Sequence, residues 1–315
     1  MIQIQTFKSL FQLQQALPTE QHCVAFFESV RWNKTPQSPF DYESKVYKCK
    51  YGYKCKSTGK YFNVLTGTIF ENSKVPLSKW FMAIWLLTTR KKGISSLQLS
   101  RDINVTQKTA WYMLQRIRNV MYCVNTSILR GEVELDETYV GGKNKNRHLS
   151  KRVPNSQGRS TKDKTAVLGM IQRGGNVVAR VVQDVKASTL TPQIVRFVKD
   201  AVAVYTDEWY GYKKLEKIYN HSIVKHSKGE YVKGTTHTNT IESFWALFKR
   251  GINGTYHFAT RKYLQSYIDE FVFRFNSRNE SDSIKFMWLL GMTDVPTVRV
   301  KHFDLMGRSK RWLFF

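Results

Sequence analysis

Three acidic residues that are far apart in the chain have the type and the placement that metal-dependent chemistry needs. Asp136 follows the strand-like run VEL, and Asp207 follows the apolar run VYT. Glu242 lies 35 positions beyond Asp207, in the segment HTNTIESFWALFKRG. Side chains at the ends of adjacent strands converge at one edge of an open α/β sheet. We therefore expect the two aspartates to meet at that edge and the glutamate to join them from a helix.

A cluster of this kind suits hard divalent cations. Three carboxylates brought together repel one another unless a cation neutralises them, and oxygen ligands are preferred by Mg²⁺ or Mn²⁺. Two such ions about 4 Å apart can activate a water or a DNA 3′-hydroxyl and stabilise the leaving oxygen in an in-line displacement at phosphorus. The expected chemistry is therefore phosphoryl transfer with two ions.

The helix that carries Glu242 would add further polar groups. On a helix that begins near Asn239, positions 239, 242, 246 and 249 share one face. Asn239, Glu242 and Lys249 would therefore look the same way. Glu137 and Glu208, which adjoin the two aspartates, would point to the opposite strand face because side chains alternate along a strand.

A purely structural role is the competing interpretation of each acid taken alone. An Asp after a strand is often a turn or cap residue, and Glu242 could be a first-turn residue favoured by the helix dipole. The joint occurrence of all three acids on the expected elements, in a basic chain, favours the metal site.

The composition indicates a folded protein with a polyanionic partner. The chain has 315 residues, of which 42% are hydrophobic and 14% aromatic, so it can bury a core and is not a disordered tail. Its 50 Lys and Arg against 24 Asp and Glu leave a formal charge of +26. A surplus of this size favours nucleic acid as the partner.

Membrane insertion and secretion are not indicated. The longest apolar run, Phe81 to Leu87, is far shorter than the roughly 20 residues of a spanning helix. The start of the chain lacks the basic and apolar regions of a signal peptide. Four cysteines in a chain of this size do not form a disulfide framework. We expect a reducing cytoplasm as the location and no membrane partner.

The segment around the acids predicts an α/β domain. Its order is a strand at 131–140, two β-branched strands joined by a glycine pair, a helix near 191–202, a strand ending at Asp207, a helix at 212–219, a short strand and a long helix from Asn239. This order matches a ribonuclease-H-like core, a mixed five-stranded sheet with flanking helices.

Two segments before residue 129 predict smaller modules. Residues 40–62 read as short β-hairpins rich in Lys and Tyr. After a buried helix at 77–92, a short helix that ends near Ile103, a turn, and a helix from Gln107 to about Met121 form the pattern of a helix-turn-helix. We expect Lys108, Arg116 and Arg118 to be exposed on it. An ordinary helical hairpin is the alternative.

At these residues the chain resembles a known family. The blocks VELDETYVGG, YTDEWYGY, HSKGEYV and HTNTIESFWALFKRGINGTYH resemble bacterial DDE-type transposases of the insertion-sequence 1595 family, with an ISXO2-like transposase domain. The stretch from TGTIF to LQRIR is similar to that family's N-terminal DNA-binding region. The resemblance covers roughly residues 20–280.

The resemblance implies a function and assigns roles. It implies an enzyme that binds the inverted-repeat ends of its element, cleaves them and joins them to target DNA with a divalent metal. Asp136, Asp207 and Glu242 become the metal-binding acids, Asn239 the accompanying asparagine, and Lys249 a basic residue that could hold a phosphate. Bringing two DNA ends together implies a homodimer or a larger assembly on DNA.

One departure from the family is plain. Its members usually carry a zinc ribbon with two Cys-x-x-Cys pairs near the N-terminus. The matching stretches here read SPFD at 38–41 and CKST at 55–58, so Cys55 alone remains of four ligands. Structural zinc sites need four Cys or His ligands. We therefore expect no zinc, and either a metal-free DNA contact or a module that has lost its role.

Fifteen residues are predicted to contact DNA because they are basic, lie in the predicted DNA-binding helix or the basic loop at 143–164, or adjoin the acids. Trp209 could stack on an unpaired base, and His237 could touch DNA, although a structural histidine is the alternative. The set comprises Lys48, Lys50, Lys54, Lys56, Gln107, Lys108, Arg116, Lys143, Lys145, Arg147, Lys151, Arg152, Trp209, His237 and Arg250.

The expected organisation has four parts. A helix and degenerate ribbon occupy 1–75, the helix-turn-helix domain 76–128, the catalytic domain 129–280 and a basic, apolar tail 281–315, which could bind DNA or a second subunit. The primary hypothesis is a metal-dependent DNA transposase. Two alternatives are a non-catalytic DNA-binding repressor derived from a transposase, and a ribonuclease-H-like nuclease that does not join strands.

Overall fold

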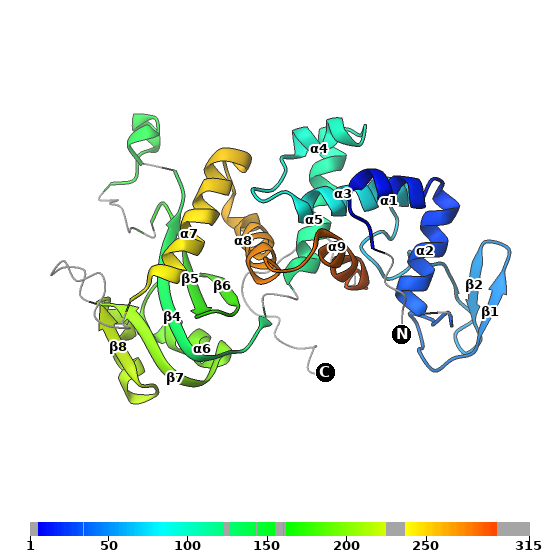
Figure 1. The fold of residues 1–315 in the computed structure, drawn as a ribbon. Helices are drawn as coiled ribbons and strands as arrows, with labels where there is room; N and C mark the ends of the chain where they lie inside the picture. The colour runs from blue at the N-terminus through cyan, green and yellow to red at the C-terminus, as the bar shows by residue number, and fades with distance from the viewer. Residues whose placement is uncertain are drawn as a thin grey trace. The chain divides into compact units, whose positions relative to one another are not determined.

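The computed structural model describes residues 6–33, 35–122, 126–142, 144–154, 160, 162–224 and 237–294 (Figure 1). It forms two compact units. The sheet unit comprises Met121–Asn279, and the helical unit comprises Met1–Val120 together with Glu280–Phe315. The finer division into four domains stays a prediction. Cys123, Lys143, the block HSKGEYV and residues 295–315 lie outside the described residues.

A mixed five-stranded sheet is the centre of the sheet unit. Its strand order is β6-β5-β4-β7-β8. The pairs β4–β5 and β5–β6 are antiparallel, whereas β4–β7 and β7–β8 are parallel. The element order therefore confirms the predicted α/β layout. The strands are β4 (Leu129–Val140), β5 (Thr165–Gln172), β6 (Val177–Val182), β7 (Val198–Asp207) and β8 (His221–Val224).

The two faces of the sheet bury separate cores. On one face, Val133 and Leu135 of β4 pack with helix α6 (Ala187–Phe197). On the other face, α7 (Asn239–Gly251) lies across β4 and β5 (Figure 1), and α8 (Arg261–Asn276) packs against β6. Because side chains alternate along a strand, Glu134 and Asp136 point to the α7 face.

A glycine lets α7 approach the sheet closely. Gly169 on β5 pairs with Asp136 on β4. A Cβ atom at Gly169 would lie 2.3 Å from the ring of Trp245 and 2.8 Å from Ile241, both on α7. Trp245 is buried, which confirms its expected place in the core. The absence of a side chain at this position therefore sets the distance between the helix and the strand of the first aspartate.

The helical unit is built around one buried helix. Nine residues of α3 (Leu77–Thr89) are buried, as its apolar sequence predicts. Helix α9 (Asp282–Gly291) packs against α3, and Phe286 meets Phe81 with ring centroids 5.9 Å apart. The expectation of a tail from residue 281 is therefore wrong for α9, which is part of this core. The other helices are α1 (Leu10–Ala16), α2 (Glu20–Trp32), α4 (Ser96–Asp102) and α5 (Gln107–Met121).

The predicted hairpins and the predicted helix pair are present in this unit. A three-stranded antiparallel sheet consists of β1 (Val46–Cys49), β2 (Gly52–Cys55) and β3 (Tyr61–Phe62). Helix α4 is capped by Ser95, whose hydroxyl accepts a hydrogen bond from the amide of Gln98. In the part of the chain that the structure describes, no helix is long and apolar enough to span a bilayer.

Candidate active site

The two aspartates lie on neighbouring parallel strands. Asp207 is the last residue of β7, as expected, whereas β4 continues to Val140, so the expected strand end at Asp136 is wrong. The parallel register of β4 and β7 pairs Glu134 with Tyr205, and continuing it by two residues sets Asp136 beside Asp207. Both aspartates share the strand face of those partners, which is the face that α7 covers. One oxygen of Asp207 accepts a hydrogen bond from the amide of Trp209, at 3.0 Å.

Glu242 enters from the first turn of α7. Glu242 is exposed, and so are Asn239 and Lys249, which lie on the same face of the helix. The opposite face of α7 is buried and includes Ile241 and Phe244. Thr238 donates a hydrogen bond to Oε1 of Glu242, at 3.2 Å. The helix is therefore oriented as the sequence pattern predicts, with its polar groups accessible.

Electrostatics join the three acids. Burial raises the pKa of Asp136, and nearby negative charges raise it further, to about 7, against a smaller opposing effect of a backbone hydrogen bond. These charges belong to Glu137, Asp207 and Glu242. No ion pair joins Asp136, Asp207 or Glu242 to a Lys or Arg among the residues that the structure describes. The local field therefore favours a bound proton or a cation.

The acids are not arranged as a finished metal site. Over the described ranges, no three His, Cys, Asp or Glu side chains lie close enough together to hold a metal ion. The expectation that the three acids meet at ligating distance is therefore not met, although their charges interact. The donor set nonetheless fits a hard cation, since it consists of carboxylate oxygens.

Glu137 takes the structural position that strand alternation predicts. Its carboxylate is buried on the face away from α7 and accepts a hydrogen bond from the hydroxyl of Tyr212, at 2.8 Å. Burial and the charge of Glu137 raise the pKa of Tyr212 well above its ordinary value. This phenol therefore stays protonated and remains a donor to Glu137.

A buried glutamate that the sequence reasoning did not single out holds the start of α7. Glu134 is fully buried. Its Oε2 accepts hydrogen bonds from the backbone amides of Thr240 and Ile241, at 2.9 and 3.0 Å, and its Oε1 accepts one from the Thr240 hydroxyl. These amides belong to the first turn of a helix, where they lack partners within the helix. The carboxylate also complements the positive end of the helix dipole.

Arg173 neutralises Glu134 and connects it to the segment before α7. Its Nε donates to Oε1 of Glu134 at 2.8 Å, and its NH2 donates to the carbonyl oxygen of His237 at 2.9 Å. The guanidinium also lies 4.0 Å from the ring centre of Tyr205. An acid inside an apolar strand was a signal for such a pair, but its partner could not be identified without the fold.

The predicted residues beside the acids differ in their surroundings. His237 places Nδ1 3.3 Å from Oε1 of Glu134, which supports its structural interpretation. Trp209 donates its indole N–H to the carbonyl oxygen of Val185, and its ring is partly exposed. Arg250 is exposed. Contact of these residues with DNA stays a prediction.

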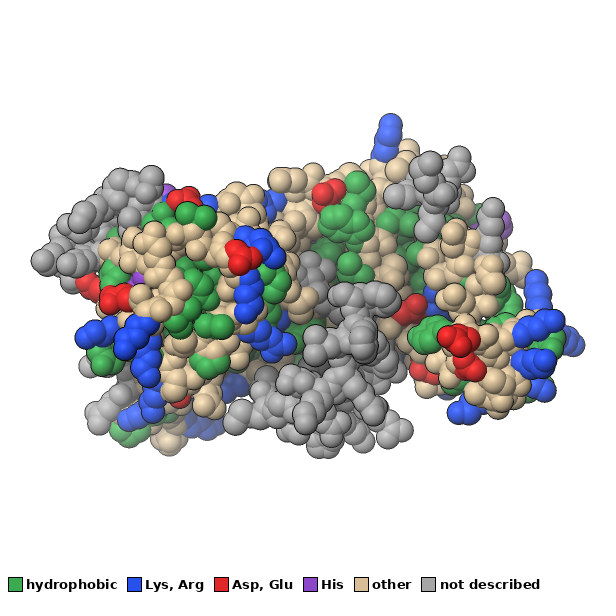
Figure 2. All heavy atoms as spheres, turned by 90° about the horizontal axis from the view of Figure 1, so that it is seen from below, with side chains coloured by type: hydrophobic (Ala, Val, Ile, Leu, Met, Phe, Trp, Pro, Cys, Tyr) green, Lys and Arg blue, Asp and Glu red, His purple; other side chains and the backbone are tan. Residues whose placement is uncertain are grey.

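The predicted basic hairpins form an exposed surface of paired lysines and rings. Nζ of Lys50 lies 5.2 Å from the ring centre of Tyr51, and Nζ of Lys54 lies 5.4 Å from that of Tyr61. Lys48 and Lys56 are exposed. Lys and Arg side chains gather at the right-hand end of Figure 2, where this sheet lies.

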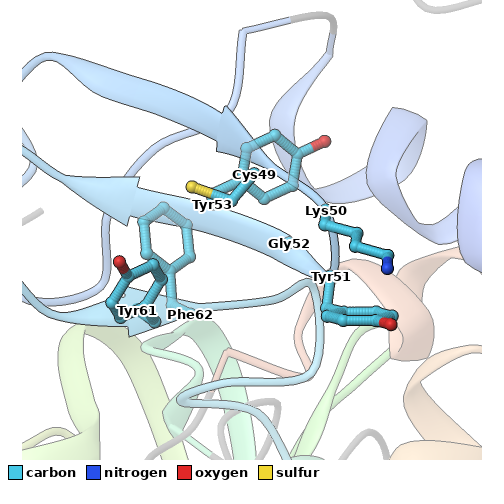
Figure 3. A pocket seen from close by; sticks show the side chains of 7 residues that line it. All are labelled: Cys49, Lys50, Tyr51, Gly52, Tyr53, Tyr61 and Phe62. Carbon is cyan, nitrogen blue, oxygen red and sulfur yellow. The ribbon is translucent and has the colours of Figure 1, made fainter.

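A hollow on the same sheet contains these rings. It is lined by residues 49–53 together with Tyr61 and Phe62, and Figure 3 shows Lys50 beside Tyr51 at one end of it. Tyr51 and Tyr61 are 85% and 68% exposed. Exposed rings and ammonium groups offer stacking surfaces for bases and charges for phosphates.

The predicted helix-turn-helix surface needs one correction. Gln107 and Lys108 are exposed at the start of α5. Arg116 and Arg118, expected on the surface, are 8% and 1% exposed. Arg116 donates to the carbonyl oxygens of Ile69 and Glu71, at 2.6 and 3.0 Å. The prediction that Arg116 contacts DNA is therefore wrong, because its buried guanidinium satisfies two backbone carbonyls instead.

Two arginines of the basic loop form hydrogen bonds within the loop. Arg152 donates to the carbonyl oxygens of Lys145 and Arg147, and Arg147 donates to that of Asp163. Lys145 and Lys151 are exposed. The arginines therefore shape the loop, whereas the lysines remain accessible to a phosphate.

Comparison with known proteins gives two sequence matches. Residues 128–276 match the family model of the ISXO2-like transposase domain. A protein of Halobacterium salinarum, described as an uncharacterized protein in transposable element ISH50, is 30% identical over 251 residues. That match covers 75% of this chain and 84% of the relative.

Two solved structures are more distantly similar. The Mos1 Strand Transfer Complex is 14% identical with a TM-score of 0.28, over 71% of this chain and 77% of that chain. The Mos1 mariner paired end complex with Mn is 15% identical with a TM-score of 0.28, over 64% and 71%. Likeness at this level carries no further conclusion.

Proposed function

Because the chain belongs to the insertion-sequence 1595 family of ISXO2-like transposases, we propose that it is an active DDE-type enzyme with a ribonuclease-H-like core. It binds the inverted-repeat ends of its element and catalyses divalent-metal-dependent cleavage of DNA and strand transfer. Asp136, Asp207 and Glu242 are the acids of the site. In this proposal, residues of β4, β7 and α7 carry out the catalysis, and the helical unit takes part in DNA binding.

One observation carries the catalytic part of the proposal. Asp136 is mostly buried next to three further acids, and its pKa is raised to about 7. Buried acids are costly unless a proton or a cation compensates them. Strongly perturbed carboxyl groups concentrate at functional sites. Asp136, Asp207 and Glu242 offer the carboxylate oxygens that Mg²⁺ or Mn²⁺ prefers.

The residues have distinct parts in this proposal. Asp136, Asp207 and Glu242 would hold one or two divalent ions, which supply Lewis-acid stabilisation of charge at a scissile phosphate. Lys249, two turns along α7 from Glu242, would hold a non-bridging phosphate oxygen, and Asn239 would donate a hydrogen bond near the same group. Glu134 positions the helix on which all three of these α7 residues lie.

The DNA partner is supported by charge and by exposed groups. The formal charge of +26 favours a polyanion. The lysine and tyrosine pairs on β1–β3 and the exposed start of α5 offer contacts for element ends. Two such ends must be held at once for strand transfer, so we propose a homodimer or a larger assembly on DNA.

The deciding experiment separates binding from chemistry. Asp136→Asn should bind DNA from the ends of the element with nearly unchanged affinity in a gel-shift assay, because the substitution leaves every Lys and Arg of the chain in place. With Mn²⁺, cleavage of end-labelled DNA should fall by at least two orders of magnitude, since stabilisation of charge at the reacting phosphate is lost. Glu208→Gln, an exposed acid next to Asp207, is the matched control and should cleave normally.

The outcomes also distinguish the alternatives. Binding without cleavage by the unchanged protein would favour a repressor derived from a transposase. Cleavage without joined products would favour a ribonuclease-H-like nuclease. Full cleavage by Asp136→Asn would show that the acids are assigned wrongly.

A further inference from the structure

Two tetrapeptides of this chain, at 38–41 and 55–58, match the stretches that carry the zinc ligands in the family. In this chain their side chains lie around the thiol of Cys55. The two tetrapeptides Ser38–Asp41 and Cys55–Thr58 come from segments before β1 and at the end of β2. Ser38 and Cys55 are both 0% exposed. The cluster formed by Ser38, Asp41, Ser44, Cys55, Ser57 and Thr58 is called the hydroxyl cluster below.

Hydrogen bonds run through the hydroxyl cluster from one tetrapeptide to the other. Sγ of Cys55 lies 3.4 Å from Oγ of Ser57. The hydroxyl of Ser57 donates to Oδ2 of Asp41, at 2.6 Å. Either group can be the donor in the contact between Cys55 and Ser57. The two tetrapeptides are thus connected through three side chains.

The remaining hydroxyls also face the sulfur. Burial raises the pKa of the Cys55 thiol, but hydrogen bonds with the hydroxyls of Ser38, Ser44, Ser57 and Thr58 outweigh it and lower the pKa to about 6. A sulfur atom surrounded on several sides by polar groups inside a small module has the environment of a ligand position.

Backbone amides also form hydrogen bonds in the turns next to the Cys55 sulfur. The amide of Gly59 donates to the carbonyl oxygen of Cys55 at 3.0 Å, and Gly59 has a φ of 69°, which favours glycine. The amide of Phe40 donates to Oγ of Ser38 at 3.2 Å, and that of Glu43 donates to Oδ1 of Asp41. Backbone amides therefore point at the side chains that replace the ligands.

These residues do not fit a zinc ion. Structural zinc is held by four thiolate, imidazole or carboxylate ligands, and the cluster contains one thiol and one carboxylate. The described residues include no group of three His, Cys, Asp or Glu side chains that could hold a metal. Sγ of Cys49 lies 3.8 Å from the carbonyl oxygen of Tyr47. Sγ of Cys23, on α2, lies 3.9 Å from the carbonyl oxygen of Leu17.

We propose that the hydroxyl cluster takes the place of the zinc ion and holds the ribbon-like module together without metal. The hydrogen bonds from Cys55 through Ser57 to Asp41 connect the same two tetrapeptides that a zinc ion would connect. The module with β1–β3 therefore folds independently of zinc. This inference does not depend on the catalytic activity of the protein.

The first test uses the full-length protein without any substitution. Purified from cells grown with zinc, it should contain substoichiometric zinc, and a zinc chelator should leave its thermal unfolding midpoint unchanged. One bound zinc per chain, or a lower midpoint with the chelator, would overturn the proposal. Cys49→Ser is the matched control, because Cys49 lies outside the cluster, and it should behave like the unchanged protein.

The second test asks whether the geometry of a metal site is retained. The triple variant Ser38→Cys, Asp41→Cys, Thr58→Cys supplies four thiols with Cys55. It should bind one Co²⁺ with the visible absorption of a tetrahedral thiolate centre, and adding Cys55→Ser to it should weaken that absorption. If the triple variant is folded by circular dichroism and takes up no Co²⁺, the four positions do not converge and the proposal fails.

A third measurement addresses the hydrogen bonds themselves. Ser57→Ala removes the connection between Cys55 and Asp41 and should lower the thermal unfolding midpoint by several degrees, equally with and without zinc. Ser73→Ala serves as a control for the loss of one serine hydroxyl outside the cluster, where it accepts a hydrogen bond from the indole of Trp80 at 3.1 Å. An unchanged midpoint for Ser57→Ala alone would contradict the role of the cluster.

Discussion

At the scale of single residues, Asp136 is the most perturbed acid of the site. Its pKa is raised to about 7 by burial and by the charges of Glu137, Asp207 and Glu242. A carboxyl whose pKa is higher in the folded than in the unfolded state binds a proton more tightly when folded. Its ionisation therefore costs folding free energy as the pH rises from about 4 to about 7.

Because ionisation of Asp136 destabilises the folded state, removing its charge should stabilise the protein. In metal-free buffer, Asp136→Asn should unfold at a higher urea concentration than the unchanged protein at pH 8, and the difference should shrink at pH 5. The upper limit is about 4 kcal/mol, three pKa units at 1.36 kcal/mol each. Urea unfolding at both pH values measures it, with Glu208→Gln, at the exposed acid next to Asp207, as the control variant. Equal differences at pH 5 and pH 8 would contradict the raised pKa.

The same residue links metal binding to pH. A cation competes with the proton on Asp136, so binding of Mn²⁺ to the unchanged protein should strengthen as the pH rises toward 7 and then level off. Mn²⁺ should also raise the unfolding midpoint of the unchanged protein at pH 8, and should not raise that of Asp136→Asn. A pH-independent affinity for Mn²⁺ between pH 5 and 8 would argue against Asp136 as a ligand.

At the scale of elements, the placement of α7 decides whether the third acid can reach the other two. The carboxylate of Glu134 accepts hydrogen bonds from the backbone amides of Thr240 and Ile241. Gly169 lets α7 lie close to β4 and β5. These contacts lie on the buried side of the helix. Glu242 lies on the accessible side of this helix, near enough for its charge to raise the pKa of Asp136.

Removing the anchor should therefore affect both stability and chemistry. Glu134→Ala leaves two helix amides without their acceptor and Arg173 without its buried acid, and should cost about 3 kcal/mol or more of folding free energy. In a variant that remains folded, such as Glu134→Gln, cleavage of element ends should fall while DNA affinity stays, because α7 is less firmly held.

The control lies two residues away on the same strand. Glu132→Gln also removes an acid that contacts Arg173, but the Glu132 side chain is 44% exposed and accepts its other hydrogen bond from the hydroxyl of Tyr205 on β7. It should cost little stability and leave cleavage nearly unchanged. A similar loss for both variants would mean that the charge near Arg173, rather than the hold on the helix, matters.

At the scale of the whole molecule, the surplus of positive charge should govern DNA affinity. Binding that releases counterions weakens with salt, with a slope of about 0.9 per phosphate contacted. The exposed Lys48, Lys50 and Lys56 on the β1–β3 module are placed for such contacts. Replacing all three by Gln should reduce the salt slope of DNA binding by about 2 to 3.

A charge-matched variant tests whether the surface matters or only the net charge. Lys213, Lys214 and Lys217 on the 3₁₀ helix Tyr210–Lys217 are exposed as well. Replacing these three by Gln changes the net charge equally and should alter the slope less, as measured by fluorescence anisotropy at several salt concentrations. Equal effects of the two triple variants would argue that the hairpins make no special contact.

The sequence alone determined the family, the element order of the sheet unit and the faces of its strands and helices. These properties are local, since the alternation of Val133, Glu134, Leu135 and Asp136 and the 3.6-residue period of α7 follow from neighbouring residues. The hairpins and the helix pair were predicted for the same reason. Asp136, Asp207 and Glu242 could be selected as site residues from their positions and from the family resemblance, without knowing how far apart they lie in the folded protein.

Only the tertiary structure decided which partners distant residues find. The buried role of Arg116, the capture of α7 by Glu134 and the packing of α9 on α3 each join segments far apart in the chain, and the sequence pattern of one segment does not identify the other. The hydroxyl cluster around Cys55 is of this kind too. Such contacts depend on how the folded backbone brings surfaces together, whereas local patterns determine only which surface each element offers.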